Sequence, residues 1–303
     1  MADDWCCLLK QLRDSNGQIS NLEQVVGRLG LETSCSRMGF LLPDRESCIR
    51  TRHPSTFYCY SDTYFGLPLW KFFKTPSYKR LAESEDTIYR LAMELIESSD
   101  EATTESVVFQ SILKANIDER EKTAAIIDFI AAGIHTLKNS LVFLLYLVAK
   151  HPGTQEKIIQ DETKAYLKAC VMETFRILPT APCLARVTEE DLELSGYRIN
   201  AGSVVICHTA IACKDDKNFK QASEFRPERW LDEEKSETAS NATFLLTPFG
   251  AGRRICPGKR FIEHILPKIL EYTVKKFDVQ VVNPMELQFE FLLSAKGPTA
   301  MIF

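Results

Sequence analysis

The sequence lacks the marks of several protein classes. Its ten cysteines are scattered without a Cys-x-x-Cys spacing, so neither a zinc site nor a disulfide scaffold is indicated. The longest apolar stretch, Leu141 to Ala149, is too short to span a bilayer. The first residues, Met-Ala-Asp-Asp-Trp, contain no apolar run and no arginine, which excludes the usual patterns of signal and transit peptides. From these absences we expect a soluble chain in a reducing compartment.

Composition is that of a globular protein with a sizeable core. The chain has 303 residues, of which 45% are hydrophobic and 26% are charged, enough for one large domain or two ordinary ones. A net charge of −4 argues against a general nucleic-acid binder. The sequence contains no internal repeat and no low-complexity tract. The length and composition alone therefore leave enzyme and binding functions open.

Apolar residues recur with helical period through most of the chain. Helices are predicted near 77–98, 107–114, 118–150 and 163–178 and from Lys259 onward. The period changes after Ala185, where a hairpin turning at Ser195-Gly196 and a strand at 203–210 are predicted. Alternating apolar residues near the C-terminus, followed by Lys296-Gly297-Pro298, predict a closing hairpin. The fold class is thus mainly α with small β-sheets, in three parts: helical 1–178, a small sheet and irregular segment 179–246, and a cysteine loop, helix and hairpin 247–303.

The most informative stretch is the loop from Thr247 to Gly258. It holds three glycines and two prolines in twelve residues, which excludes regular structure there. Cys256 stands at the mouth of the helix that follows, and Pro257 suits a first helical position. The helix dipole and the neighbouring Arg253 and Arg254 place positive potential near the sulfur, which favours a thiolate.

Three interpretations of this loop compete. The first is a structural turn with a buried free cysteine, the commonest fate of a lone Cys. The second is a phosphate-binding glycine loop, which is weaker because Gly250-x-Gly252 lacks a third glycine and a Lys-Ser/Thr ending. The third is a thiolate ligand to haem iron.

The spacing Phe249-x-x-Gly252-x-Arg254-x-Cys256-x-Gly258 resembles the haem-ligand signature of the cytochrome P-450 family. The resemblance implies a cytochrome P-450 fold, a haem b cofactor and Cys256 as the axial ligand of its iron. It also implies haem contacts from the other signature residues, Phe249, Gly252, Arg254 and Gly258. A further haem contact is implied at Arg186, which matches a position that reaches a propionate in relatives; without the resemblance it is a solvated strand-edge arginine.

The long predicted helix contains Ala131-Ala132-Gly133-Ile134-His135-Thr136. A glycine inside a helix costs about 1 kcal/mol relative to alanine, so Gly133 needs a compensating reason, and Thr136 shares its face. Alone, the hexamer is typical of a buried helix whose Thr hydroxyl bonds back to its own backbone. The resemblance implies an oxygen-activating helix, in which Gly133 leaves room for O2, Thr136 directs protons, and His135 replaces the usual acid.

Glu173 and Arg176 lie three residues apart on the next predicted helix. Such a pair is usually an ordinary surface ion pair. The family resemblance instead implies a buried structural triad, completed by Arg229 of the Phe-Arg-Pro-Glu-Arg-Trp segment.

Residues 249–261 and 67–79 resemble the mitochondrial-type branch of the family. This implies a mitochondrial location on the matrix side of the inner membrane, an adrenodoxin-like [2Fe-2S] ferredoxin as electron donor, and hydroxylation of a steroid with O2. Lys168 matches a family lysine that docks the ferredoxin, but Met172 stands where a second is usual. Relative to the family pattern we expect the N-terminal portion and segments after Ser36 and Gln160 to be missing. A catalytically silent truncated or splice variant, at most binding the ferredoxin, is therefore the alternative.

Overall fold

The structure is a computed structural model that describes residues 2–27, 29, 67–98, 107–231, 242–290 and 292–303. The predicted gap after Ser36 lies outside these residues. Apart from the first two residues, the chain divides into two compact units: residues 3–142 with 286–300, and residues 143–285 with 301–303.

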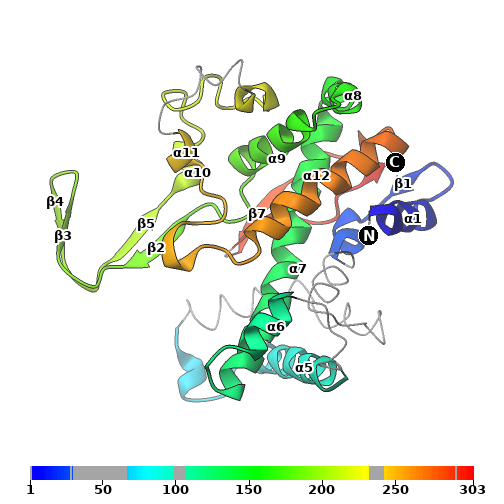
Figure 1. The fold of residues 1–303 in the computed structure, drawn as a ribbon. Helices are drawn as coiled ribbons and strands as arrows, with labels where there is room; N and C mark the ends of the chain where they lie inside the picture. The colour runs from blue at the N-terminus through cyan, green and yellow to red at the C-terminus, as the bar shows by residue number, and fades with distance from the viewer. Residues whose placement is uncertain (1, 28, 30–66, 99–106, 232–241, 291) are drawn as a thin grey trace. The chain divides into compact units, whose positions relative to one another are not determined.

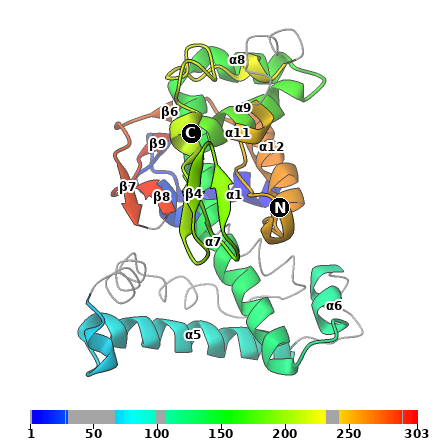
Figure 2. The same ribbon diagram turned by 90° about the vertical axis from the view of Figure 1, so that its left-hand side faces the viewer.

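The first unit is mainly helical. Trp5 and Leu9 are fully buried on its first helix, and the Asn21 side chain accepts the Gln24 amide at 3.0 Å as a helix cap. Figure 2 shows α5 as one long helix. In chain order the unit contains α1 (Ala2–Leu12), β1 (Gln18–Ile19), η1 (Leu69–Lys71), α5 (Pro76–Ser98), α6 (Val107–Leu113), the first part of α7 (Glu119–Lys150), β7 (Leu287–Glu290) and β8 (Leu292–Ala295).

Helix α7 confirms the longest predicted helix. The Asp118 carboxylate accepts the Glu121 amide at 2.9 Å, which caps the first turn. By length and composition α7 could cross a bilayer, but 69% of its most apolar window is buried inside the protein, as in the core helix of a globular domain. The helix ends at Lys150, before His151 and Pro152. Its residues from Phe143 onward belong to the second unit.

The second unit is built on packed helices. Figure 1 shows α9 and α12 side by side. Helix α12 turns Ile265, Leu266, Ile269 and Leu270 into the core, the spacing of one helical face. The helices after α7 are α8 (Pro152–Gln160), α9 (Ala165–Ile177), α10 (Thr209–Ala212), η2 (Pro227–Trp230), α11 (Ala242–Leu245), η4 (Gly252–Arg254) and α12 (Lys259–Lys276).

Short antiparallel strands complete the second unit. β2 (Leu184–Val187) pairs with β5 (Val204–Cys207), β3 (Leu192–Leu194) with β4 (Tyr197–Ile199), and β6 (Gln280–Val281) with β9 (Met301–Ile302). The predicted hairpin is confirmed: it turns at Ser195 and Gly196, whose φ angles are 51° and 82°, as a two-residue hairpin turn requires. Close to the last pair, the side chain of the buried Gln155 makes two hydrogen bonds with the backbone of Val279. Its Nε2 donates to the Val279 carbonyl at 2.9 Å, and its Oε1 accepts the Val279 N–H at 3.1 Å.

The first unit contains a C-terminal hairpin, but its predicted turn is wrong. Leu287 pairs with Ala295 and Glu290 with Leu292, so Lys296-Gly297-Pro298 follows the second strand instead of joining the two. The Lys296 amide donates to the Glu286 carbonyl at 2.8 Å, which extends the pairing one step beyond the strands.

Candidate functional site

The cysteine loop closes on itself through its backbone. The Gly250 amide donates to the Thr247 carbonyl at 3.0 Å, and the Cys256 amide donates to the Phe249 carbonyl at 2.8 Å. Gly250 and Gly252 have φ angles of 72° and 73°, a region that residues with a Cβ enter only at a cost. The glycines of the motif are therefore needed for the shape of the loop.

The loop delivers Cys256 to the start of α12. Gly258 is the N-cap of the helix, and the Lys259 amide donates to the Cys256 carbonyl at 3.3 Å. Pro257 precedes the N-cap, so the expectation that it occupies the first helical position is wrong. A Cβ added at Gly258 would lie 3.7 Å from the Cys256 sulfur. Glycine at this position thus keeps the space beside the sulfur free.

Cys256 is exposed, unlike the cysteines of the core. Burial raises the pKa of the Cys170 and Cys213 thiols, which favours their protonated form. The interpretation of Cys256 as a buried structural cysteine does not fit this exposure.

The surface around Cys256 fits a flat, apolar ligand with anionic groups. Ile255 exposes 44% of its surface, and a Cβ added at Gly252 would meet no atom within 4 Å. Arg253 and Arg254 are exposed, and within the described parts of the chain neither forms an ion pair. An exposed thiol, open glycine backbone and two available guanidinium groups suit a haem with its carboxylates.

Strand β2 lies against the same loop. A Cβ at Gly250 would lie 3.8 Å from Leu184 Cδ2, so the Leu184 side chain is turned toward the loop. Alternate residues of a strand share a face, and Arg186 therefore lies on the face of β2 that carries Leu184. Its guanidinium is exposed and donates to the Ala185 carbonyl at 2.8 Å.

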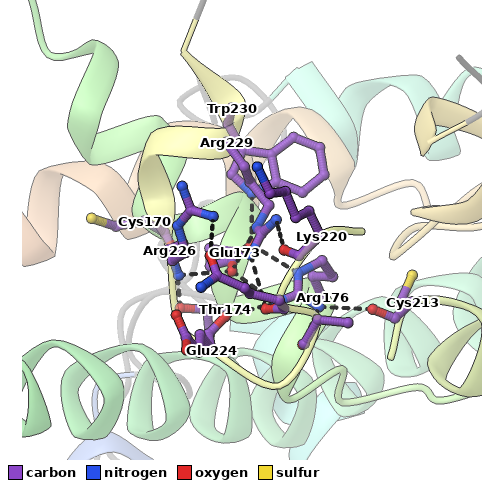
Figure 3. A network of polar contacts seen from close by, with 12 residues as sticks. Cys170, Glu173, Thr174, Arg176, Cys213, Lys220, Glu224, Arg226, Arg229 and Trp230 are labelled. Carbon is purple, nitrogen blue, oxygen red and sulfur yellow. Dashed lines mark hydrogen bonds and ion pairs between the residues drawn. The ribbon is translucent and has the colours of Figure 1, made fainter. Parts of the chain in front are cut away.

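A buried polar network surrounds Glu173 on α9 (Figure 3). Glu173 and Arg176 are fully buried, and Arg229 of η2 is 1% exposed. Five N–H groups donate to the Glu173 carboxylate. Oε1 accepts Arg176 Nη2 at 2.8 Å, the Arg226 amide at 2.9 Å and Arg229 Nε at 3.1 Å, and Oε2 accepts Arg176 Nε and Trp230 Nε1, both at 2.9 Å.

The two guanidinium groups also bind the backbone of the segment that precedes η2. Arg176 donates to the carbonyls of Cys213 and Ala222 at 2.7 Å each and to that of Glu224 at 2.9 Å, and Arg229 donates to those of Lys220 at 2.9 Å and Gln221 at 3.3 Å. One carboxylate thus faces two guanidinium groups. Backbone carbonyls accept the remaining N–H groups of Arg176 and one N–H from each terminal nitrogen of Arg229, which offsets the cost of burying the charges.

Sequence reasoning missed two members of this network, the Arg226 amide and the Trp230 indole. Their signal was present, because Trp230 directly follows Arg229 in the segment that supplied the third residue of the triad. A buried indole N–H needs a partner, and a carboxylate with free lone pairs nearby offers one.

Helix α9 also contacts the cysteine loop. The ring of Phe175 packs edge to face on the ring of Phe249, with centroids 5.3 Å apart and planes at 80°. Phe175 lies between Glu173 and Arg176 in the chain, so the polar network and the loop are joined by neighbouring residues of one helix.

The residues predicted on the long helix lie in the first unit, whereas Cys256 and the Glu173 network lie in the second. Gly133, His135 and Thr136 are each partly exposed on α7. The Thr136 hydroxyl donates to the carbonyls of Ala132 at 2.9 Å and Gly133 at 3.3 Å, which is the back-bonded state that the sequence alone indicated.

Lys168 is exposed on α9, five residues before Glu173, and Met172 is partly exposed one turn further on. The helix therefore presents the Lys168 cation on its surface while the Glu173 side is buried.

Comparison with known proteins supports the family resemblance of the cysteine loop. The model of the family "Cytochrome P450" matches residues 7–302. Ecdysone 20-monooxygenase of Drosophila melanogaster is 40% identical over 99% of this chain and 63% of its own length. A probable mitochondrial cytochrome P450 12b2 of the same species is 30% identical over 86% of this chain and 55% of its own length. Mouse mitochondrial 1,25-dihydroxyvitamin D(3) 24-hydroxylase is 26% identical over 94% and 60%, respectively.

The chain thus spans between 55% and 63% of the length of these three relatives. The match nevertheless covers nearly all of its own residues, including the cysteine loop and the Glu173 network. With this coverage and a 40% identical relative, the chain belongs to the haem-dependent cytochrome P450 family.

Proposed function

We propose that the protein is a haem-thiolate monooxygenase that hydroxylates a steroid, converting ecdysone to 20-hydroxyecdysone. The observation that carries this proposal is the 40% identity, over 99% of the chain, with a protein named ecdysone 20-monooxygenase. The exposed thiol of Cys256 at the start of α12 supports it. Electrons would come from an adrenodoxin-like [2Fe-2S] ferredoxin and the oxygen from O2. A mitochondrial location is supported by relatives whose names include that compartment.

The loop residues would hold the cofactor. When bound, the haem supplies an iron centre whose thiolate ligand favours O–O cleavage. The sulfur of Cys256 would ligate the iron, and Gly252 and Gly258 would leave the backbone open to the flat ring. Arg254 and Arg186 would pair with the propionates, because both guanidinium groups are exposed and charge-assisted bonds to carboxylates are strong.

We assign the handling of O2 and protons to three residues of α7. Gly133 carries no side chain and would leave room for O2 beside the helix. The Thr136 hydroxyl can hold a proton at Oγ1 and release its bond to Ala132 to donate elsewhere. His135, next to it in the chain, can accept and return a proton near neutral pH.

The remaining predicted residues would stabilise the fold or bind the electron donor, without taking part in the reaction itself. Glu173, Arg176 and Arg229 would fix the segment before η2 against α9, and so hold the framework of the loop. The exposed ammonium of Lys168 would attract an acidic ferredoxin, since surface charges chiefly increase the rate of encounter.

The test is the absorption spectrum of the haem-reconstituted chain, reduced and exposed to carbon monoxide. We expect a strongly red-shifted Soret band, which is lost in Cys256→Ala. The matched control is Cys207→Ala, which removes another exposed thiol of the same unit and should leave the band unchanged. Incubation with ecdysone, O2 and ferredoxin, kept reduced by its reductase and NADPH, should then yield 20-hydroxyecdysone and water.

Two results would refute the proposal at different steps. A folded, helical chain without the red-shifted band would favour the catalytically silent variant, which at most binds the ferredoxin. A chain that shows the band and hydroxylates other steroids but not ecdysone would support the monooxygenase activity and refute ecdysone as the substrate.

A further inference from the structure

We propose that Phe175 of α9 is a positioning residue for Cys256 and acts on it through Phe249. This inference rests on the proposed function, because it concerns the sulfur that would ligate the haem iron. Phe175 contacts Phe249, so its influence on Cys256 passes through one intervening residue.

Phe249 is held at two points that together fix Cys256. Its ring packs edge to face on Phe175, with centroids 5.3 Å apart and planes at 80°. Its carbonyl oxygen accepts the Cys256 amide at 2.8 Å. Ring and carbonyl belong to the same residue, so a ring that is held in one place also fixes the acceptor of the Cys256 amide.

Phe175 is suited to this task because its own position is constrained. It is 5% exposed and lies between Glu173 and Arg176, both of which are fully buried. Those two neighbours hold the network of ion pairs and hydrogen bonds that ties α9 to η2 and to the segment before it. The network therefore holds the backbone that carries Phe175, and the burial of its ring limits the rotamers that it can adopt.

The backbone hydrogen bonds of the loop are local. Those described for the amides of residues 250–259 all end on acceptors within residues 247–256, and residues 251–257 are exposed. Contacts with other elements include that of Leu184 on β2 near Gly250 and that of Phe175 on Phe249. Of these two, the Phe175 contact is made by the residue that also bonds to Cys256.

The first test measures hydrogen exchange of the Cys256 amide in the full chain without haem, relative to the Ile269 amide in the buried part of α12. We expect Phe175→Ala to raise this rate ratio about tenfold, and Phe175→Leu, which keeps an apolar contact, to raise it about threefold. The matched control is Phe277→Ala, because Phe277 forms the same edge-to-face pair with Phe303 in the same unit, at 6.0 Å and 90°. It should leave the ratio unchanged.

The second test uses the reduced, carbon monoxide-bound spectrum of the reconstituted chain. Phe175→Ala should move part of the red-shifted Soret absorbance to the position typical of haem without a thiolate ligand, whereas Phe277→Ala should not. If the Phe175→Ala variant does not fold, the same exchange ratio and spectrum are measured on Phe175→Leu, which keeps an apolar side chain at this position.

An unchanged exchange ratio in both Phe175 variants would overturn the inference, as would an equal change in Phe277→Ala. Because exchange is measured without haem, this result is independent of the proposed function. A parent chain without the red-shifted band would refute haem-thiolate ligation and would leave the exchange result as the test of Phe175.

Discussion

Replacing Glu173 by glutamine tests the buried network most directly. The substitution keeps the shape of the side chain but removes its charge and turns one acceptor oxygen into an NH2 donor. Oε1 accepts three N–H groups and Oε2 accepts two. Whichever oxygen is replaced, the new amide donor faces at least two other donors, and two buried guanidinium groups lose their only carboxylate among the described residues.

The expected loss follows from the burial of those guanidinium groups. Arg176 is fully buried and Arg229 is 1% exposed, so water cannot replace the missing carboxylate. Removing one partner of a buried ion pair costs about 3–5 kcal/mol. With a denaturant dependence of about 3 kcal/mol per M in urea, a loss of about 4 kcal/mol lowers the midpoint by about 1.3 M.

Urea unfolding followed by far-ultraviolet circular dichroism measures the effect. The matched control is Asp191→Asn, the same chemical change in an exposed ion pair with Arg198, where the side chains are 51% and 78% exposed. This control should leave the midpoint unchanged. A Glu173→Gln midpoint that falls no further than the control would refute the argument that the network stabilises the second unit.

Two further predictions concern α12 and the loop before it. Hydrogen bonds from Lys275 and Lys164 lower the pKa of Glu271 below its usual 4.5 despite burial. The interactions of the Glu271 carboxylate with the two lysines therefore stabilise the fold above pH 4.5, and this stabilisation is lost as the pH falls through the lowered pKa. Glu271→Gln should flatten the fall of the urea midpoint between neutral and acid pH, and an unchanged slope would contradict this. Gly250→Ala should destabilise the chain by about 1–2 kcal/mol, because φ is positive there. The control is Gly153→Ala in α8, where an added Cβ meets no atom within 4 Å, and this variant should not be destabilised. Equal unfolding midpoints for the two variants would contradict the argument from backbone strain.

The helices could be predicted from the sequence because their signals are local. The run from 118 to 150 repeats apolar residues at one period and ends before Pro152, and the structure places α7 at Glu119–Lys150. The hairpin at Ser195-Gly196 was equally predictable, since a two-residue turn needs residues that accept positive φ. Cys256 could be proposed as a site residue for the same reason, because its motif lies within ten residues.

Contacts between distant segments could not be predicted in the same way. The hydrogen bond from Trp230 to Glu173 spans 57 residues, and its only sign in the sequence is that Trp230 directly follows Arg229, because neither residue's own local pattern indicates the other. The pairing of Phe175 with Phe249 has no local sign at all, because an apolar residue on a helix can pack against any neighbour. Pro257 is an error of a different, local kind: the sequence favours a helix start there, but Gly258 is the N-cap and α12 begins at Lys259.

The segment before η2 has a consequence for the order in which the chain folds. Its carbonyl groups at Cys213, Lys220, Gln221, Ala222 and Glu224 are bound by arginine side chains rather than by strands of a sheet. Ordering such a loop costs entropy, and of these five carbonyls only that of Gln221 also accepts a described local backbone amide, from Glu224 at 3.0 Å. The segment should therefore remain unstructured until α9 and η2 have met, and should fold with them in a single late step.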